Sequence, residues 1–209
     1  MVSKVHTKKE LKLIFKSIET FISKKWDKHI MVRETAGKYV KSIVYGGLDG
    51  IITTFAIVAA VAGANLSATI VLILGFANMF ADGVSMASGD YLSTHAQEDY
   101  DKANNKKVKK GESPLKNAVA TFFSFIGFGF IPLIAYLIAP TNEFLTKYVF
   151  TVASILTLIT FGILGWLKAT VTNKHYAKGI SQTIIVGGTA ALIAYGIGWF
   201  ISTIVGVSV

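Results

Sequence analysis

The sequence predicts an all-α membrane protein with five transmembrane helices, a cytoplasmic amino terminus and an additional amphipathic helix near that terminus. Of its 209 residues, 52% are hydrophobic and only 16% are charged, whereas roughly a quarter of the residues of a soluble domain are charged. Five apolar segments have about the 20 residues needed to cross a hydrocarbon core of roughly 30 Å. All but one of the 21 basic residues lie on one side of these segments.

The first predicted region, 1–40, is a cytoplasmic segment with a basic amphipathic helix at 8–30. Its apolar residues recur at helical spacing, with Lys9, Lys12, Lys16 and Lys24 on the other side. The apolar positions are Leu11, Ile14, Phe15, Ile18, Phe21, Ile22 and Trp26. Such a helix usually lies on the membrane surface, although a partner-docking or regulatory helix has the same pattern.

The second region, 41–209, is predicted to be a transmembrane transport domain. Its spans are expected at about 42–64, 67–92, 118–138, 148–167 and 182–207. Only a tight turn around Gly63 and Asn65 separates the first two, so they should form an antiparallel hairpin. The basic residues precede the first span or lie in 93–117 and 168–181, with Lys147 alone on the opposite side. By the positive-inside rule that basic side is the cytoplasm, and the net charge of +9 is explained by the lipid bilayer without nucleic acid.

Several other classes of protein have no support in the sequence. There is no cysteine, so neither disulfides nor thiolate metal sites are available. We find no phosphate-cradling glycine loop, nucleophile elbow or zinc-protease helix. We therefore expect neither an enzyme nor an ATP-driven pump, and no permanently bound cofactor. The first 40 residues contain no apolar run typical of a cleaved signal peptide.

Three acidic residues, Asp49, Asp82 and Asp90, lie in the first two spans, and no span contains a basic residue. An ionisable group in hydrocarbon costs at least about 2.5–3.5 kcal/mol on insertion scales, so it usually marks a pathway or a paired group. A transported cation or protons would supply the missing partner. Asp49 could instead cap a helix, but a helix starting at Gly50 would leave only 15 residues before Asn65, too few for a span.

In the second span, Asn78, Asp82, Met86 and Asp90 recur every four residues and form one stripe. Carboxylate and amide oxygens suit hard ions, and a methionine sulfur shifts the preference toward softer ions such as ferrous iron. We therefore predict metal ligands among Asp49, Asp82, Met86, Asn78 and Asp90. Two alternatives stay open: Met86 packs in the core, and Asp90 faces interfacial water.

A second stripe, of small residues, runs beside the first: Ala77, Ala81, Ser85 and Gly89. Small residues at this spacing let helix backbones approach closely, and the glycine-rich fifth span is a plausible neighbour. On the cytoplasmic side, His95 and Asp99 share a helical face. They could capture a metal ion, but we favour an ordinary pair on a solvated surface.

The segment Gly47–Gly50 together with Asp82–Leu92, which reads Asp-Gly-Val-Ser-Met-Ala-Ser-Gly-Asp-Tyr-Leu, resembles the vacuolar iron transporter family. The resemblance covers about residues 38–207, and its specific part is the first hairpin. It implies a homodimer whose ion path is lined by the first two helices of each subunit. It also implies proton-coupled export of ferrous iron, and in some members manganese, with Asp49 and Met86 lining the path.

The sequence departs from the family pattern in two places. Eukaryotic members carry a glutamate where Asn78 stands here, and the nearest acid is Asp82, one turn later. They also insert a glutamate-rich cytoplasmic domain between the second and third helices. The corresponding segment here, 93–117, has only 25 residues and six lysines, so ion capture by such a domain should be absent or reduced.

The leading hypothesis is a divalent-cation/proton antiporter that exports ferrous or manganous ions from the cytosol. Asp49 would bind the ion and exchange protons, Asp82 would complete the charge, and Met86 with Asn78 would tune selectivity. The alternatives are a non-transporting scaffold that docks partners through its amphipathic helix, and a passive cation channel. A short chain without that cytoplasmic domain favours the plasma membrane of a prokaryote over an organelle membrane.

Overall fold

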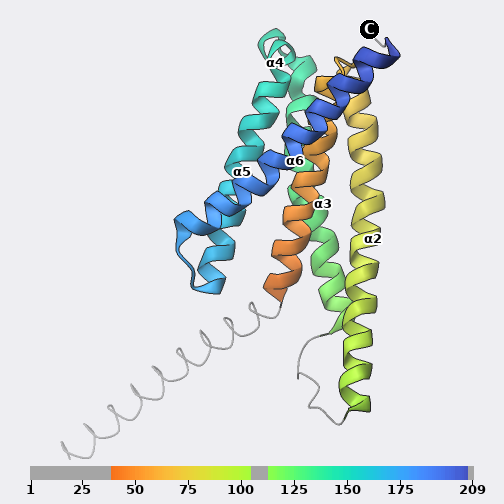
Figure 1. Cartoon of the computed structure of the whole chain (residues 1–209), viewed down its shortest axis with the longest axis vertical. Helices are drawn as coiled ribbons and strands as arrows, with labels where there is room; N and C mark the ends of the chain where they lie inside the picture. Colours follow the sequence, from red (N-terminus) through yellow and green to blue (C-terminus); the bar gives the residue numbers. More distant parts are fainter. Residues whose placement is uncertain (1–38, 105–112, 207–209) are drawn as a thin grey trace, which may run out of the picture. The chain divides into compact units, whose positions relative to one another are not determined.

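The computed structural model describes residues 39–104 and 113–206, and the amphipathic helix predicted for 8–30 lies outside them. The described part is helical and contains no β-strand (Figure 1). Its first helix, Tyr39–Gly63, is drawn in orange and is called the first spanning helix below. The others are α2 (Ala68–Ala103), α3 (Pro114–Ile138), the 3-10 helix η1 (Ala139–Thr141), α4 (Glu143–Lys147), α5 (Val149–Thr172) and α6 (Tyr176–Val205).

Five of these helices are long and apolar enough to cross a membrane, which confirms the predicted fold class. They are the first spanning helix, α2, α3, α5 and α6, and the short helices η1 and α4 connect α3 to α5. With 36 residues, α2 is about 54 Å long, well beyond the roughly 30 Å of a hydrocarbon core. Its last turns carry exposed charged residues such as Asp99 and Lys102, which suit the aqueous side of the interface.

The predicted hairpin between the first two spans is present. Asn65 adopts a left-handed conformation with φ of 54°, which asparagine tolerates better than most residues. The backbone N–H groups of Asn65 and Leu66 donate to the carbonyls of Ala62 and Val61, at 3.1 and 3.0 Å. These bonds satisfy carbonyls at the helix end and reverse the chain within a few residues.

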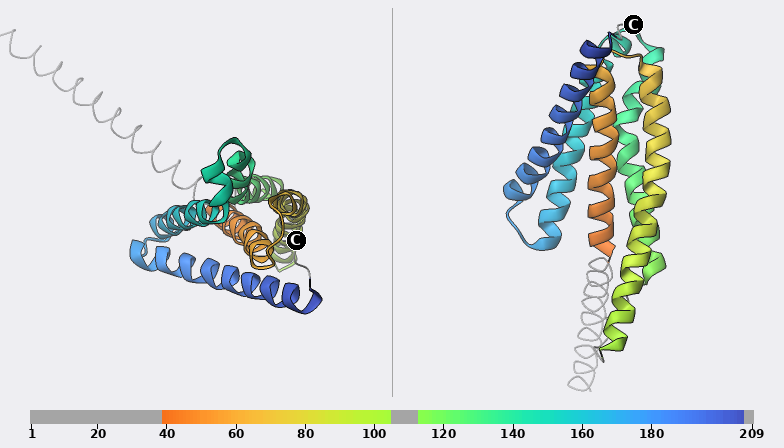
Figure 2. Two further views of the ribbon diagram at one scale, coloured as in Figure 1. Left: turned by 90° about the horizontal axis from the view of Figure 1, so that it is seen from above. Right: turned by 45° about the vertical axis from the view of Figure 1, so that its right-hand side comes forward.

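The first spanning helix lies between the other long helices (Figure 2). Three of its side chains, Ile51, Thr54 and Val58, are completely buried. The remaining long helices pack in the pairs α2 with α3, α3 with α5, and α5 with α6. Residues on this central helix are therefore shielded by neighbours, whereas α2 and α6 expose much of their surface.

Glycines bring the first spanning helix against the backbones of its neighbours. A Cβ atom added to Gly50 would lie 2.3 Å from the carbonyl oxygen of Phe125 in α3. At the other end of the helix, a Cβ atom on Gly198 of α6 would lie 2.1 Å from the carbonyl oxygen of Ala60. Because these distances exclude any side chain, the close helix contacts require glycine at both positions.

The small-residue stripe of α2 does not pack against α6 in the described chain, so the expected pairing with the fifth span is wrong. Ala77, Ala81, Ser85 and Gly89 are all exposed. Two glycines of α6 pack on other helices instead, because Gly187 meets the ring of Phe161 in α5 and Gly198 meets the first spanning helix. Small-residue spacing marks a close-packing surface without specifying which helix covers it.

Replacing Gly198 by alanine should destabilise the bundle by about 1–3 kcal/mol, the usual cost of overpacking a close contact. Gly196, two residues earlier in α6, has nothing within 4 Å of an added Cβ atom. The Gly196→Ala variant is therefore the matched control and should unfold at the wild-type temperature or slightly above it. Thermal unfolding in detergent measures both, and equal midpoints would contradict the close contact.

Candidate intramembrane metal site

Asp49 lies inside the first spanning helix. The helix is continuous from Tyr39 to Gly63, and the Thr53 hydroxyl donates to the Asp49 backbone carbonyl at 2.8 Å, one turn along it. The prediction that Asp49 is not a terminal cap is therefore confirmed. The neighbouring glycines pack on α3, and the Asp49 side chain is half-buried.

Asp82 of α2 lies close enough to Asp49 for their negative charges to repel each other. The amide nitrogen of Asn78 donates to Asp82 Oδ2 at 3.1 Å, so these two members of the predicted stripe are in contact. Neither carboxylate forms an ion pair with a basic side chain within residues 39–104 and 113–206. The hairpin thus contains two acids and an amide, and no basic side chain of the described residues pairs with either acid.

Met86 follows Asp82 by one turn of α2 and is half-buried. It packs against the edge of the hydrophobic cluster that contains Met79 and Phe125. This placement gives Met86 a packing role, and its role as a soft ligand stays a prediction.

Asp90 lies apart from the pair, two turns and about 12 Å beyond Asp82 along α2. Its carboxylate accepts hydrogen bonds from Ser42 of the first spanning helix, at 2.8 Å, and from Thr121 of α3. Thr94 of α2 also donates to it, at 3.5 Å. Our sequence reasoning did not identify these hydroxyl residues; hydroxyls in apolar spans, opposite an unpaired acid, are the signal that could have found them.

One copy of the described chain contains no group of three or more His, Asp or Glu side chains that could hold a metal ion. The ligands that one chain offers around Asp49 and Asp82 are two carboxylates, the amide of Asn78 and the thioether of Met86. A transition-metal ion prefers four to six ligands, so these groups provide part of a coordination shell.

The pair formed by His95 and Asp99 is a surface contact. His95 Nδ1 lies 3.1 Å from Asp99 Oδ2, and Lys102 Nζ lies 3.4 Å from the other oxygen of the same carboxylate. All three side chains are more than half exposed. This geometry agrees with the ordinary pair that we favoured over metal capture.

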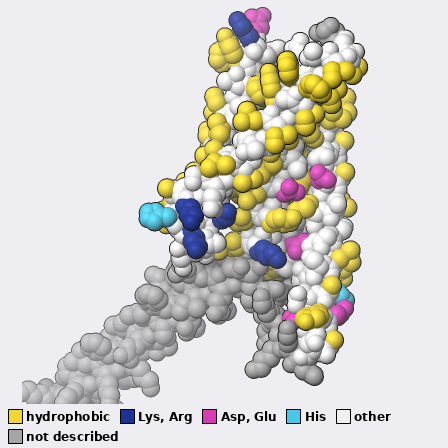
Figure 3. Space-filling view, viewed as in Figure 1, with side chains coloured by type: hydrophobic (Ala, Val, Ile, Leu, Met, Phe, Trp, Pro, Cys, Tyr) yellow, Lys and Arg dark blue, Asp and Glu magenta, His cyan; other side chains and the backbone are white. Residues whose placement is uncertain are grey.

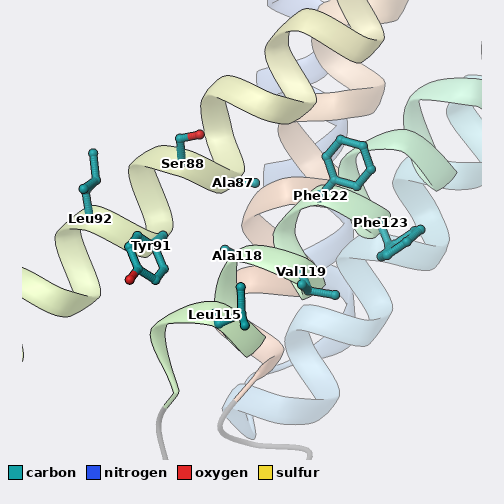
Figure 4. Close-up of a pocket in the computed structure, with 9 residues that line it drawn as sticks. All are labelled: Ala87, Ser88, Tyr91, Leu92, Leu115, Ala118, Val119, Phe122 and Phe123. Atoms are coloured by element: carbon teal, nitrogen blue, oxygen red, sulfur yellow. The ribbon is translucent and has the colours of Figure 1, made fainter.

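On the face of the bundle drawn in Figure 3, hydrophobic side chains are spread along the helices, and a few acidic side chains lie midway along it. A groove of about 590 Å³ lies between α2 and α3 (Figure 4). Leu92 and Phe122 are typical of its walls, where Ser88 and Tyr91 supply the only hydroxyls. No carboxylate and none of the five predicted ligand residues lines this groove, so it is not the metal site.

The fold and the acidic pair define a multi-pass helical membrane protein whose intramembrane carboxylates have no basic partner among the described residues. A model of the VIT family matches residues 40–111 and 105–199, which is more than half of the chain, and the chain belongs to that family. It is 28% identical to a vacuolar iron transporter of Toxoplasma gondii, over 82% of this chain and 77% of the relative. It is also 28% identical to a vacuolar iron transporter of Plasmodium falciparum, over 82% and 85%. The vacuolar iron transporter homolog 4 of Arabidopsis thaliana is 26% identical, over 76% and 82%.

The first two alignments run over 233 and 234 positions, more than the 209 residues of this chain, so they include segments that this chain lacks. The family match is also divided in two, and its parts meet at residues 105–111, between α2 and α3. Both findings agree with the short connection noted in the sequence.

Neutralising one acid of the pair should stabilise the protein in the absence of added metal. The Asp49→Asn variant keeps the shape of the side chain and removes its repulsion with Asp82, so we expect roughly 0.5–1 kcal/mol of stabilisation. The Asp99→Asn variant, at an exposed and ion-paired position, should show no gain. Thermal midpoints in chelator-treated detergent solution measure this, and a lower midpoint for Asp49→Asn would contradict the repulsion.

Proposed function

We propose that this protein exports divalent transition-metal cations, ferrous and manganous ions, from the cytosol in exchange for protons. The observation that carries the proposal is that Asp49 and Asp82 lie in the two membrane-spanning helices of one hairpin and form no ion pair with a basic side chain in residues 39–104 and 113–206. A site built in this way favours a bound cation or protons, because two ionised carboxylates in a low-dielectric region repel each other. The names of the relatives support iron as the transported ion.

The ligand types favour a transition metal over magnesium or calcium. Asp49 and Asp82 supply charge, Asn78 supplies an amide beside Asp82, and Met86 supplies a polarisable sulfur one turn away. An all-oxygen shell suits hard ions, whereas one thioether shifts the preference toward ferrous iron. In this proposal Asp90 is outside the ion site, because it lies about 12 Å beyond Asp82 along α2 and its carboxylate joins that helix to its neighbours.

The same two carboxylates account for the proposed exchange. A metal ion binds the deprotonated groups, and protonation of the groups releases it. Two protons replace one divalent cation without changing the charge of the site. A transporter that changes access between its two occupied forms would therefore move protons and metal in opposite directions.

A homodimer would complete the site. The exposed stripe of Ala77, Ala81, Ser85 and Gly89 on α2 provides a surface on which a second copy could pack closely. In a two-fold dimer the same surface meets itself, so each copy would add its own acids beside the axis. Four carboxylates and two thioethers could then surround a single path, which accounts for the incomplete ligand set of one chain.

The other two hypotheses make different predictions. A scaffold would bind no ferrous or manganous ion in detergent, whereas a transporter should bind them with an affinity that falls at acid pH. A passive channel would conduct the metal without moving protons. The names of the relatives refer to a vacuole and do not favour the prokaryotic plasma membrane that we expected.

Removal of either acid should abolish exchange. In proteoliposomes, the Asp49→Asn and Asp82→Asn variants should lower metal-dependent proton flux to the level of protein-free vesicles, because each loses a charged ligand. The Asp99→Asn control alters an exposed surface acid and should keep wild-type flux. Wild-type flux in both site variants would refute the proposed function.

Substitution of Met86 tests the ligand chemistry. The Met86→Leu variant keeps the side-chain volume, so it should cost less than about 1.5 kcal/mol of stability. It should reduce the preference for ferrous over manganous ion several-fold, because the soft ligand is lost. The Met79→Leu control changes a fully buried methionine of the same helix and should leave the preference unchanged. Anaerobic competition transport measures both, and an unchanged ratio in Met86→Leu would restrict that residue to packing.

A further inference from the structure

We infer that Asp90 is a positioning residue. Its carboxylate hydrogen-bonds the cytoplasmic half of α2 to the first spanning helix and to α3, and these bonds determine the position of Asp82 relative to Asp49. This inference rests on the proposed function, because it concerns the geometry of the same ion site. It differs from the role predicted from the sequence, in which Asp90 was itself a metal ligand.

The contacts of Asp90 join three helices. Ser42 of the first spanning helix and Thr121 of α3 both donate to Asp90 Oδ2, the first at 2.8 Å. Thr94, one turn further along α2, donates to Oδ1 at 3.5 Å. Hydrogen bonds to an ionised carboxylate are roughly twice as strong as those between neutral groups, so this is a strong connection between helices.

The donors belong to the buried part of the bundle. Ser42 is only 4% exposed and Thr121 is fully buried. Asn117 of α3, which is also buried, donates to the Thr94 hydroxyl at 3.5 Å and extends the network. Without Asp90, two buried hydroxyls would lose the acceptor they share, which makes its contribution more than that of a surface contact.

The first spanning helix and α3, which supply the donors to Asp90, are also in direct contact with each other. A Cβ atom on Gly46 would lie 2.6 Å from the Thr121 carbonyl oxygen, so the two backbones touch at the level of Asp90. The Ser124 hydroxyl also donates to the Ile43 carbonyl at 2.5 Å, a second bond between the same helices. Asp90 therefore anchors α2 to a pair of helices that are already held together.

Asp82 has no comparable anchor. The hydrogen bond of its carboxylate in the described chain is to Asn78, on its own helix. The position of Asp82 opposite Asp49 must consequently come from the packing of α2 as a whole, and Asp90 is the polar contact two turns away that fixes it. The carboxylate of Asp90 accepts on both oxygens, from Ser42 and Thr121 at Oδ2 and from Thr94 at Oδ1.

The test compares variants of the hydroxyl donors with variants of the acid. Thr121→Val removes the hydroxyl and keeps the shape, Thr121→Ser keeps the hydroxyl, and Ser42→Ala removes the second donor. Ser93→Ala is the matched control, because the Ser93 hydroxyl donates to the Asp90 backbone carbonyl and not to its carboxylate. Manganous-ion binding to the full chain in detergent, and KM and kcat for manganous ion in proteoliposomes, are measured beside Asp90→Asn and Asp49→Asn.

We expect Thr121→Val combined with Ser42→Ala to weaken manganous-ion binding about 10–100-fold, the usual effect of removing groups that orient ligands. In this double variant, KM for manganous ion should rise more than kcat falls. The Thr121→Ser and Ser93→Ala variants should bind manganous ion like wild type. Adding Asp90→Asn to the double variant should cause no further loss of binding, because the three residues act as one unit. If Asp90→Asn does not fold, the comparison of Thr121→Val with Thr121→Ser still decides the question.

Wild-type binding in the Thr121→Val, Ser42→Ala double variant would overturn the inference. If Asp90→Asn then abolished binding, Asp90 would be a direct ligand, and if it did not, Asp90 would have no part in the site. Loss of binding in Thr121→Ser equal to that in Thr121→Val would also overturn it, because the hydroxyl would not matter. The proposed function fails separately, by full manganous-ion binding in Asp49→Asn.

Discussion

The close contact between the first spanning helix and α3 is the constraint on which the rest of the structure depends. Gly46 and Gly50 allow the backbones of the two helices to touch, and the Ser124 hydroxyl bonds across the same contact. Since helices in lipid gain little from hydrophobic burial, such close packing and interhelical hydrogen bonds must supply their association. The glycine face of the helix is occupied by α3, which leaves Asp49 to face the α2 side, where the charge of Asp82 acts on it.

The acidic pair is a feature that packing alone would not retain. Two carboxylates that repel each other reduce the stability of a membrane protein, whereas a neutral pair of the same shape would not. Proteins tolerate such a conflict at functional sites, where the missing partner is a substrate. The membership of the VIT family and the names of the relatives fit a metal ion as that partner.

Much of this fold could be predicted from span length and charge placement, because a bilayer imposes both. The same reasoning placed Asp49 inside a helix, since a span beginning at Gly50 would have been too short. The choice of helix neighbours could not be predicted, because small residues permit close approach to any helix; α6 uses Gly198 against the first spanning helix and leaves the α2 stripe exposed. The hydrogen-bond partners of Asp90 could not be predicted either, since Ser42 and Thr121 are 48 and 31 residues away in the chain.

The three intramembrane acids differ in how well their hydrogen-bonding capacity is satisfied, and that difference separates their roles better than their spacing does. Asp90 recurs in register with Asp82, so periodicity alone would give both the same task. Its carboxylate nevertheless accepts hydrogen bonds from hydroxyl groups of three helices, so it already has protein partners that contribute to helix packing. Asp82 has an amide from its own helix and a second negative charge nearby, so a cation improves its environment. Asp90, which accepts hydrogen bonds from three helices, therefore contributes to helix packing. Asp82, which has a donor only from its own helix in the described chain, is available to bind the substrate.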